Sequence, residues 1–233
     1  MITIECLVQG MLDNNVYLVS DGEATLLVDP STRPQQILER LGGRKVDAIM
    51  CTHFHSDHTG ALAALKQATD ATVYASEQDA PLIETPSKAS LSSPIPIQEP
   101  CKVDVCVNDG DVVRLGSMEW TVIHTPGHSK GSMCWYLPAG EEVLLELPSR
   151  SLSRTEMENK GAVPVLLSGD TLFAGCTGRT DFKGGSIPDM QHSMVRLAEL
   201  PDETIVLPGH NSYTSIAAER AITFPRWGVS DFA

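Results

Sequence analysis

Three of the seven histidines in this 233-residue chain lie within six consecutive positions. They are His53, His55 and His58, with Asp57 among them, and they directly follow the apolar stretch Val46–Cys51, which predicts a buried strand. In an extended or looped segment the side chains of His53 and His55 project to the same side, whereas Asp57 and His58, at a predicted helix start, project elsewhere. One short loop can therefore supply ligands to two neighbouring metal ions. The fold must place this loop at the end of a strand.

Three further segments repeat the pattern of an apolar strand, a turn and a potential metal ligand. They end at His128, Asp170 and His210, and two of them read Pro-Gly-His. Strand ends that converge at one sheet edge are where sites are built on rigid scaffolds. Such a set of nitrogen and oxygen ligands without thiolates suits two borderline or hard cations, Zn²⁺ first and Fe²⁺ or Mn²⁺ as alternatives. The expected metal ligands are His53, His55, Asp57, His58, His128, Asp170 and His210.

The charge and the cysteines narrow the class of partner. The chain carries 17 Lys and Arg against 30 Asp and Glu, a net charge of −13. This balance argues against binding to nucleic acid or to an anionic membrane surface. The absence of an apolar run of 18 residues, of a signal-peptide pattern and of any CxxC pair predicts a cytoplasmic protein with free thiols. We expect a small-molecule substrate and either a monomer or a homodimer.

The pattern of apolar runs and turn signals predicts one α+β domain over residues 1–233. Short strands in each half, closed by helices, favour two sheets packed face to face with helices outside, and their order is not that of regular βαβ units. The stretch Glu141–Val163 breaks this rhythm and is interpreted as a solvated loop, with a substrate lid as the alternative. Predicted strands are 2–8, 16–19, 24–28, 46–51, 72–75, 102–107, 112–115, 118–124, 133–137, 165–167 and 204–207, and predicted helices are 34–41, 58–68, 76–83 (capped by Ser76), 189–200 and 212–221.

Four motifs together resemble the metallo-β-lactamase superfamily. They are THFHSDH at 52–58, HTPGH at 124–128, GDTLF at 169–173 and PGH at 208–210. The resemblance implies a four-layer αββα sandwich. It implies one metal ion held by His53, His55 and His128, and a second held by Asp57, His58 and His210. Asp170 would bridge the two ions, and Asp29 would orient the ligands around them.

Within the superfamily, residues 169–179 (GDTLFAGCTGR) are similar to the same segment of glyoxalase II, the hydroxyacylglutathione hydrolases, and residues 180–185 to compact bacterial relatives. The resemblance implies that Arg179 contacts the thiol part of the substrate, with Lys183 and Tyr213 as further candidate contacts. Asp181, the spacing before Tyr213 and the 23 residues after His210 depart from the glyoxalase II pattern. The identity of the thiol carrier therefore stays open.

The expected reaction is hydrolysis of a thioester. Two divalent cations sharing Asp170 would share a water and lower its pKa, so that hydroxide is available to attack the carbonyl carbon. A thiolate, with a pKa near about 8.5, leaves without much help from an acid. The catalytic residues would be Asp57, which orients the nucleophile, and Asp170.

Several alternatives remain. A persulfide dioxygenase with one Fe²⁺ shares the GRTDF segment, and a lactone or β-lactam hydrolase shares the ligands. A non-catalytic binding protein is disfavoured because no ligand is missing. His124, His192, Cys51 and Cys176 are interpreted as structural residues, with His192 facing solvent and Cys176 in the core.

Overall fold

Two β-sheets form the body of the molecule in the computed structural model, which describes residues 1–87, 97–148 and 161–230. The first sheet has the strand order β10-β1-β2-β3-β4-β5-β6. Its first three strands in the sequence are antiparallel neighbours, and β3 to β6 are parallel. The strands are β1 (Ile2–Gln9), β2 (Asn14–Ser20), β3 (Thr25–Val28), β4 (Ala48–Met50), β5 (Thr72–Ser76), β6 (Val105–Val107) and β10 (Val143–Glu146).

The second sheet has the order β15-β14-β11-β9-β8-β7 and carries a small hairpin beside it. In this sheet β11 and β14 are parallel, so their carboxyl ends lie at the same edge. Its strands are β7 (Val112–Leu115), β8 (Met118–His124), β9 (Met133–Leu137), β11 (Val165–Gly169), β14 (Ile205–Pro208) and β15 (Thr214–Ser215), and the hairpin is β12 (Leu172–Phe173) and β13 (Cys176–Thr177).

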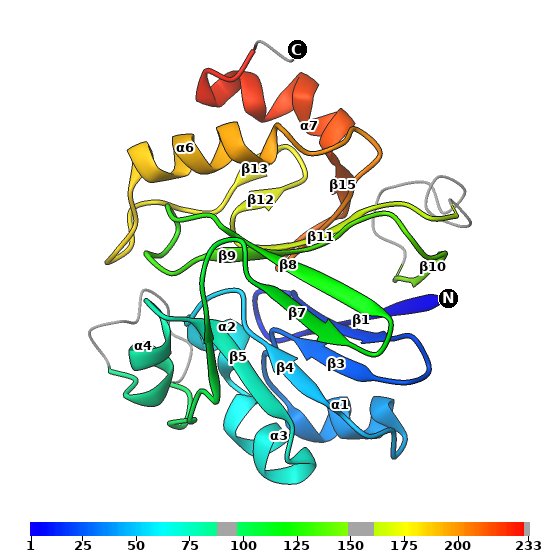
Figure 1. Ribbon diagram of the computed structural model, residues 1–233. Coiled ribbons are helices and arrows are strands. Elements are labelled where there is room, and N and C mark those ends of the chain that lie inside the picture. Colours follow the sequence, from blue (N-terminus) through cyan, green and yellow to red (C-terminus); the bar gives the residue numbers. More distant parts are fainter. Residues whose placement is uncertain (88–96, 149–160, 231–233) are drawn as a thin grey trace.

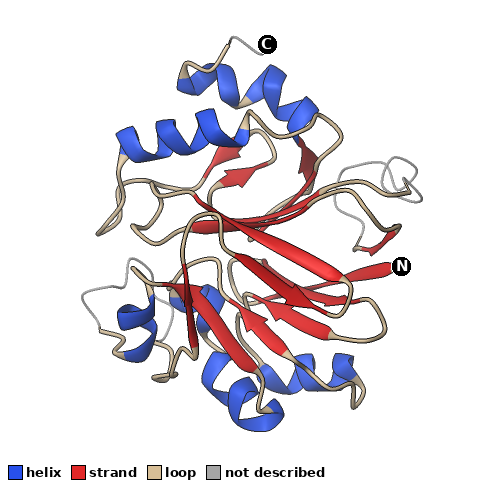
Figure 2. Cartoon of the chain, in the orientation of Figure 1, coloured by secondary structure: helices blue, strands red, loops and turns tan. Residues whose placement is uncertain are grey.

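Helices cover the outer face of each sheet (Figure 2). Below the first sheet lie α1 (Pro34–Leu41), α3 (Leu62–Thr69) and α4 (Ala80–Glu84), and above the second lie α6 (Ile187–Leu197), α7 (Ile216–Ile222) and the 3-10 helix η2 (Phe224–Trp227). Separate apolar clusters fill the spaces between helices and sheet on both sides and between the two sheets. The predicted four-layer αββα sandwich is confirmed. In the described part of the chain, no helix is long and apolar enough to cross a membrane.

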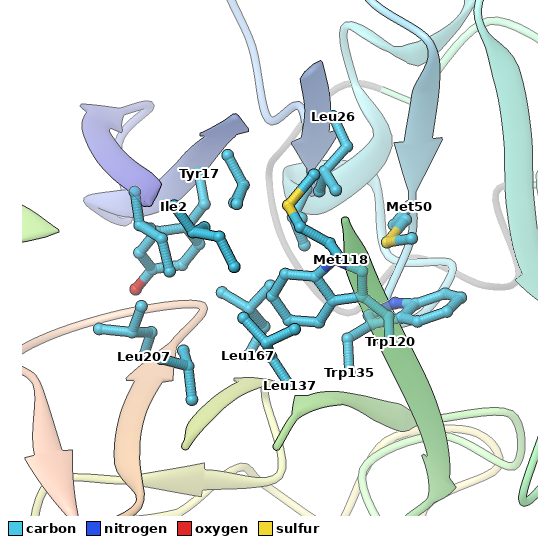
Figure 3. Close-up of a cluster of buried hydrophobic side chains, with 14 of the residues drawn as sticks. Ile2, Tyr17, Leu26, Met50, Met118, Trp120, Trp135, Leu137, Leu167 and Leu207 are labelled. Atoms are coloured by element: carbon cyan, nitrogen blue, oxygen red, sulfur yellow. The ribbon is translucent and has the colours of Figure 1, made fainter. Parts of the chain in front are cut away.

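The cluster between the sheets fixes how they face one another (Figure 3). Alternate residues of β8 are buried, among them Met118 and Trp120, because successive side chains of a strand point to opposite faces. Trp135 of β9 is fully buried and donates its indole N–H to the backbone oxygen of Cys51, at 3.3 Å. Burial of each such side chain contributes ~2–3 kcal/mol. This packing holds the end of β4 against the second sheet.

The helix expected from His58 to Ala68 is two helices, α2 (Ser56–Thr59) and α3. The break lies at Gly60, where a Cβ would come within 2.3 Å of the backbone oxygen of Ser31. Ala61 donates its N–H to the backbone oxygen of Pro30 instead of continuing α2. A close approach to the segment after β3 therefore ends the first helix, and no local sequence signal reports that contact.

Three other predictions need correction. Part of the expected loop Glu141–Val163 is the strand β10, which pairs in parallel with β1, and residues 149–160 lie outside the described residues. The last long helix begins at Ile216, after the short strand β15, rather than at Ser212. Helix α4 begins at Ala80 rather than at 76; Asp79 stands at its N-cap position without a capping hydrogen bond from its side chain, and the hydroxyl of Ser76 accepts the N–H of Asp79.

Candidate metal centre

The seven predicted ligands come from loops at the carboxyl ends of four strands in the two sheets. His53 and His55 follow β4, and Asp57 and His58 are in α2; His128 follows β8, Asp170 follows β11 and His210 follows β14. The N–H of Met133 donates to the backbone oxygen of Thr52, at 3.0 Å, and joins the first of these loops to the second sheet. The structure brings all seven side chains together, with at most about 15 % of any of them exposed.

The first group consists of His53, His55 and His128, all buried. Nδ1 of His55 lies 2.9 Å from Nε2 of His128. The ring of His53 is 4.7 Å from that of His55 and 4.9 Å from that of His128, centroid to centroid. One ligand atom from each of the three lies within 4.8 Å of the others, so a single cation can reach all three.

The second group consists of Asp57, His58 and His210. Nε2 of His58 lies 3.1 Å from Nε2 of His210. Oδ2 of Asp57 lies 3.2 Å from Nε2 of His210 and 3.4 Å from Nε2 of His58. The three ligand atoms again form a compact set.

Asp170 lies between the two groups. Its Oδ1 is 3.2 Å from Nε2 of His58, and its Oδ2 is 3.5 Å from Nε2 of both His128 and His210. Its carboxylate oxygens thus lie near Nε2 atoms of both groups, which is the arrangement that a shared ligand requires.

Backbone and carboxylate acceptors turn three of the imidazoles toward the centre. Nδ1 of His128 donates to the backbone oxygen of Arg179 at 2.7 Å, and Nδ1 of His210 donates to that of Leu12 at 2.9 Å. Nδ1 of His58 donates to Oδ2 of Asp29 at 3.0 Å. In the neutral ring a proton on Nδ1 leaves Nε2 as an acceptor, so these rings present lone pairs to the centre.

Asp29 also orients His53, through Thr52. The Thr52 hydroxyl donates to Oδ2 of Asp29 at 2.6 Å, and the Thr52 N–H donates to Oδ1 at 2.7 Å. With its proton so used, the hydroxyl oxygen accepts from Nδ1 of His53, at 3.1 Å. The opposite atom, Nε2 of His53, is buried and has no hydrogen-bond partner in the described part of the molecule. The expected orienting role of Asp29 thus has a geometric basis.

These atoms fit divalent cations. Two unprotonated Nε2 atoms 3.1 Å apart, on His58 and His210, repel one another unless a proton or a cation lies between them. The buried Nε2 of His53 likewise costs free energy unless something binds it. Imidazole and carboxylate are ligands for zinc, iron and manganese. The histidine and aspartate groups are consistent with a dinuclear metal site.

The protonation preferences of the metal-free protein differ between the two groups of ligands. Burial, together with the neighbouring histidines, lowers the pKa of His53 well below its usual value and that of His55 to about 3. Although burial works against it, Asp170 raises the pKa of His58 well above its usual value and that of His210 to about 9. The same contacts hold the pKa of Asp170 well below its usual range in spite of burial.

In the turn after β14, the Cα of Gly209 has room for a hydrogen atom but not for a side chain. A Cβ there would lie 2.6 Å from Cε1 of His58 and 2.7 Å from Oδ1 of Asp170. The Pro-Gly-His motif is therefore needed for close approach as well as for the turn.

Two residues at the centre were not predicted from the sequence. Asn14 is buried, and its Nδ2 lies 3.1 Å from Oδ2 of Asp57, inside the second group. Asp79 is also buried and accepts from the N–H of Phe54, from the hydroxyl of Ser129 and from the N–H of Gly131, at 2.9 to 3.1 Å. Burial raises the pKa of Asp79 to about 6. Asp79 connects the loop of His53 and His55 to that of His128. The only sequence signal for Asn14 was its place in a turn, and Asp79 had none.

The three predicted substrate contacts have different surroundings. Arg179 is exposed beside the first group, paired with Asp181 through two hydrogen bonds of 2.9 and 2.7 Å and stacked on the ring of Phe182 at 4.3 Å. Lys183 is exposed and lines a pocket next to the same group. Tyr213 is instead 2 % exposed, in the core between the sheets, and this burial leaves it no surface for a substrate contact.

Phe182 is an additional aromatic residue at the edge of the centre. Its ring centroid is 5.6 Å from those of His55 and His128. Of the histidines interpreted as structural, His124 contacts the backbone oxygen of Lys130 through Nε2 and His192 is exposed on α6. Cys176 is exposed rather than in the core, whereas Cys51 is buried.

Proteins of similar sequence cover nearly the whole chain. An uncharacterized protein of Aquifex aeolicus is 36% identical over 219 residues, which are 91% of this chain and 91% of that protein. Hydroxyacylglutathione hydrolase GloC of Haemophilus influenzae is 27% identical over 223 residues, 93% of this chain and 94% of its own length.

Solved structures show the same architecture. BLEG-1 B3 metallo-beta-lactamase superposes with a TM-score of 0.77 at 27% identity, covering 95% of this chain and 97% of that one. TTHA1623, solved in a di-iron-bound form, superposes with a TM-score of 0.74 at 31% identity, covering 94% of this chain and 98% of that one. The family model of the metallo-beta-lactamase superfamily matches residues 10–144 and 160–210, a range that includes all seven expected ligands. This chain belongs to the metallo-beta-lactamase superfamily.

Proposed function

We propose that this protein is a binuclear metal-dependent hydrolase that cleaves a thioester of the hydroxyacyl-thiol kind. The observation that carries the proposal is the position of Asp170 between two groups of three ligands. The similarity of GDTLFAGCTGR to glyoxalase II and the 27% identity to a hydroxyacylglutathione hydrolase support the substrate class. The metal ions would be zinc, or else iron, which the di-iron relative supports, or manganese.

When bound, the two cations would supply a water of lowered pKa and a positive charge close to the developing oxyanion. His53, His55 and His128 would hold one of them and Asp57, His58 and His210 the other, with Asp170 shared. Asp57 keeps one carboxylate oxygen close to His58 and His210, and in this position it can accept a hydrogen bond from the attacking water and orient it. Asn14 donates to the same carboxylate and holds it in place.

Substrate recognition would come from the edge of the centre beside the first group. Phe182 offers an apolar surface next to His55 and His128, and Arg179 and Lys183 are the exposed cations nearest to it in sequence. The bidentate pairing of Arg179 with Asp181 already offsets its charge, so the contact of Arg179 with a thiol carrier is expected to be weak. The partner would be a small-molecule thioester rather than nucleic acid or a membrane. The protein would act in the cytoplasm.

The decisive experiment measures metal content and turnover on the same preparations. Wild type is expected to hold two metal ions per chain and to hydrolyse hydroxyacyl thioesters. Asp170→Ala and His128→Ala are expected to lose at least ~100-fold in kcat/KM while keeping the circular dichroism of the wild type. His192→Ala, an exposed histidine on α6, is the control and should behave as wild type. Full turnover by metal-analysed Asp170→Ala would overturn the proposal.

The same substrate panel separates the alternatives. A β-lactam is included because of the likeness to BLEG-1, and lactones and a persulfide are included because the ligand set also suits them. One iron per chain with oxygen consumption on the persulfide would favour a dioxygenase. If the protein hydrolysed a lactone or β-lactam but no thioester, the proposed metal-dependent hydrolysis would stand and the proposed substrate class would be wrong.

A further inference from the structure

A pocket of about 250 Å³ lies next to the first ligand group, and Lys183 is the one residue of its lining that has been given a part in substrate recognition above. Phe54 and Leu82 give it an apolar wall, and Lys130 and Lys183 give it two ammonium groups. Both lysines are exposed, and neither forms an ion pair with a carboxylate in residues 1–87, 97–148 and 161–230. The pocket therefore offers two uncompensated positive charges in a protein whose net charge is −13.

The carboxylate in the pocket lining is that of Asp79, and it does not neutralise the lysines. Its two oxygens are turned toward the interior and accept from Phe54, Ser129 and Gly131. It is 1 % exposed. An entering ligand thus meets the lysines at the surface and the apolar wall behind them.

The pocket shares a wall with the metal centre. Phe54 stands in the chain between His53 and His55, and its ring is 4.5 Å from the ring of His55. On the other side, Lys183 directly follows Phe182, whose ring is 5.6 Å from His55 and His128. A Cβ at Gly184, also in the lining, would be 3.7 Å from Cγ of Lys130, so the two lysine-bearing loops are in contact. A molecule with its reacting group at the histidines can therefore extend its far end to the lysines.

We infer that the pocket lined by Phe54, Lys130 and Lys183 is a subsite for a carboxylate-terminated, otherwise apolar arm of the substrate. The inference rests on the proposed function and narrows its substrate class to anionic thioesters. An ammonium group and a carboxylate attract one another most where part of the water is displaced, and the apolar wall displaces it. Arg179 is not part of this subsite, because Asp181 already occupies its guanidinium.

The test compares charged and neutral versions of one substrate series. N-acetylcysteamine monothioesters of succinate, glutarate, adipate and suberate are assayed beside their methyl esters on the metal-loaded protein. Wild type is expected to prefer the free carboxylate at the best chain length by about tenfold in kcat/KM, mainly through KM. Lys130→Gln with Lys183→Gln is expected to remove that ratio, and added salt is expected to weaken it in the wild type.

Matched variants make the result specific. Lys102→Gln removes the same charge from an exposed lysine outside the pocket and should keep the preference. Arg179→Gln should keep it as well. No carboxylate preference at any chain length, or a preference that persists in the double variant or disappears in Arg179→Gln, would overturn the inference.

A binding measurement separates this inference from the proposed function. Hexanoate and hexanamide are titrated against the metal-loaded protein, with metal content checked before and after. Hexanoate is expected to bind about tenfold more tightly than hexanamide in wild type and equally in the double variant. If no thioester is hydrolysed but this difference is found, the proposed function fails and the anionic subsite stands; equal binding in wild type overturns the subsite.

Discussion

Asp29 shows how one side chain away from the ligands can set their orientation. It accepts three hydrogen bonds, from the N–H and hydroxyl of Thr52 and from Nδ1 of His58. Through these contacts it directs His58 into the second group and, by way of Thr52, His53 into the first. Both groups therefore depend on a single buried carboxylate.

Asp29→Asn tests this dependence at the residue scale. Asparagine tolerates the positive φ of 50° at this position, so the backbone should be kept. Its amide can accept at only one of the two oxygen positions, and the loss of an orienting acceptor typically costs 10–100-fold in metal affinity. Competition with a chromophoric chelator measures this, with Asp47→Asn, an aspartate remote from the centre, as control. Unchanged affinity of Asp29→Asn would show that the orientation of the rings does not need the charge.

At the scale of elements, the two sheets are joined at a turn as well as through the core. Asp21, in the turn between β2 and β3, accepts from the N–H groups of Glu23 and Ala24 at 2.8 Å. Its other oxygen accepts from the N–H and hydroxyl of Ser117, in the turn between β7 and β8. Burial raises the pKa of Asp21, but these hydrogen bonds outweigh it and lower the pKa to about 2.

This contact predicts a pH-dependent contribution to stability. Because the folded pKa is below the usual 3.8, the contribution is complete above pH ~4 and is lost as the pH falls toward 2. We expect Asp21→Asn to lower the free energy of unfolding by about 1 kcal/mol at pH 7, after allowance for solvent screening of this partly exposed group. Urea unfolding at pH 7 and near pH 2 should show the difference shrinking, whereas Glu23→Gln in the same turn should show none. A constant difference at both pH values would contradict the assignment.

For the whole molecule, the seven ligands join loops from both sheets at one point. Cations held there would bind the folded chain and not the unfolded one, and would therefore stabilise it by mass action. At a free metal concentration about 1,000 times Kd this amounts to ~4 kcal/mol, or a rise in Tm of about 10 °C for a chain of this size. Calorimetry of metal-loaded and chelator-treated protein measures it, with Asp170→Ala, which should respond far less, as the comparison.

Metal binding to the whole site should also depend on pH. In the metal-free protein the pKa of His58 is raised and that of His210 is raised to about 9, so protons compete with a metal ion for their Nε2 atoms. The metal-induced rise in Tm should therefore shrink as the pH falls from 9 to 6. Titration in buffers of different ionisation enthalpy should reveal proton release, and a pH-independent affinity without proton release would contradict this reasoning.

The sequence by itself determined the ligand residue types, their place at strand ends and the layer architecture. Local periodicity and turn chemistry encode strands such as Met118–His124 and Met133–Leu137, and a set of motifs spread along the chain identifies the superfamily. The positions of ligands such as His53 and Asp170 follow from the same motifs, because a turn at a strand end is a local property.

Only the tertiary structure decided what depends on contacts between segments distant in sequence. The pairing of β10 with β1, the break at Gly60, the burial of Tyr213 and the link made by Asp79 each involve partners far along the chain. Strand pairing at a sheet edge and the burial of a single side chain are set by which surfaces meet. A local sequence pattern carries no information about a partner 25 or more residues away. For that reason contacts such as those of Asp79 became known only from the fold.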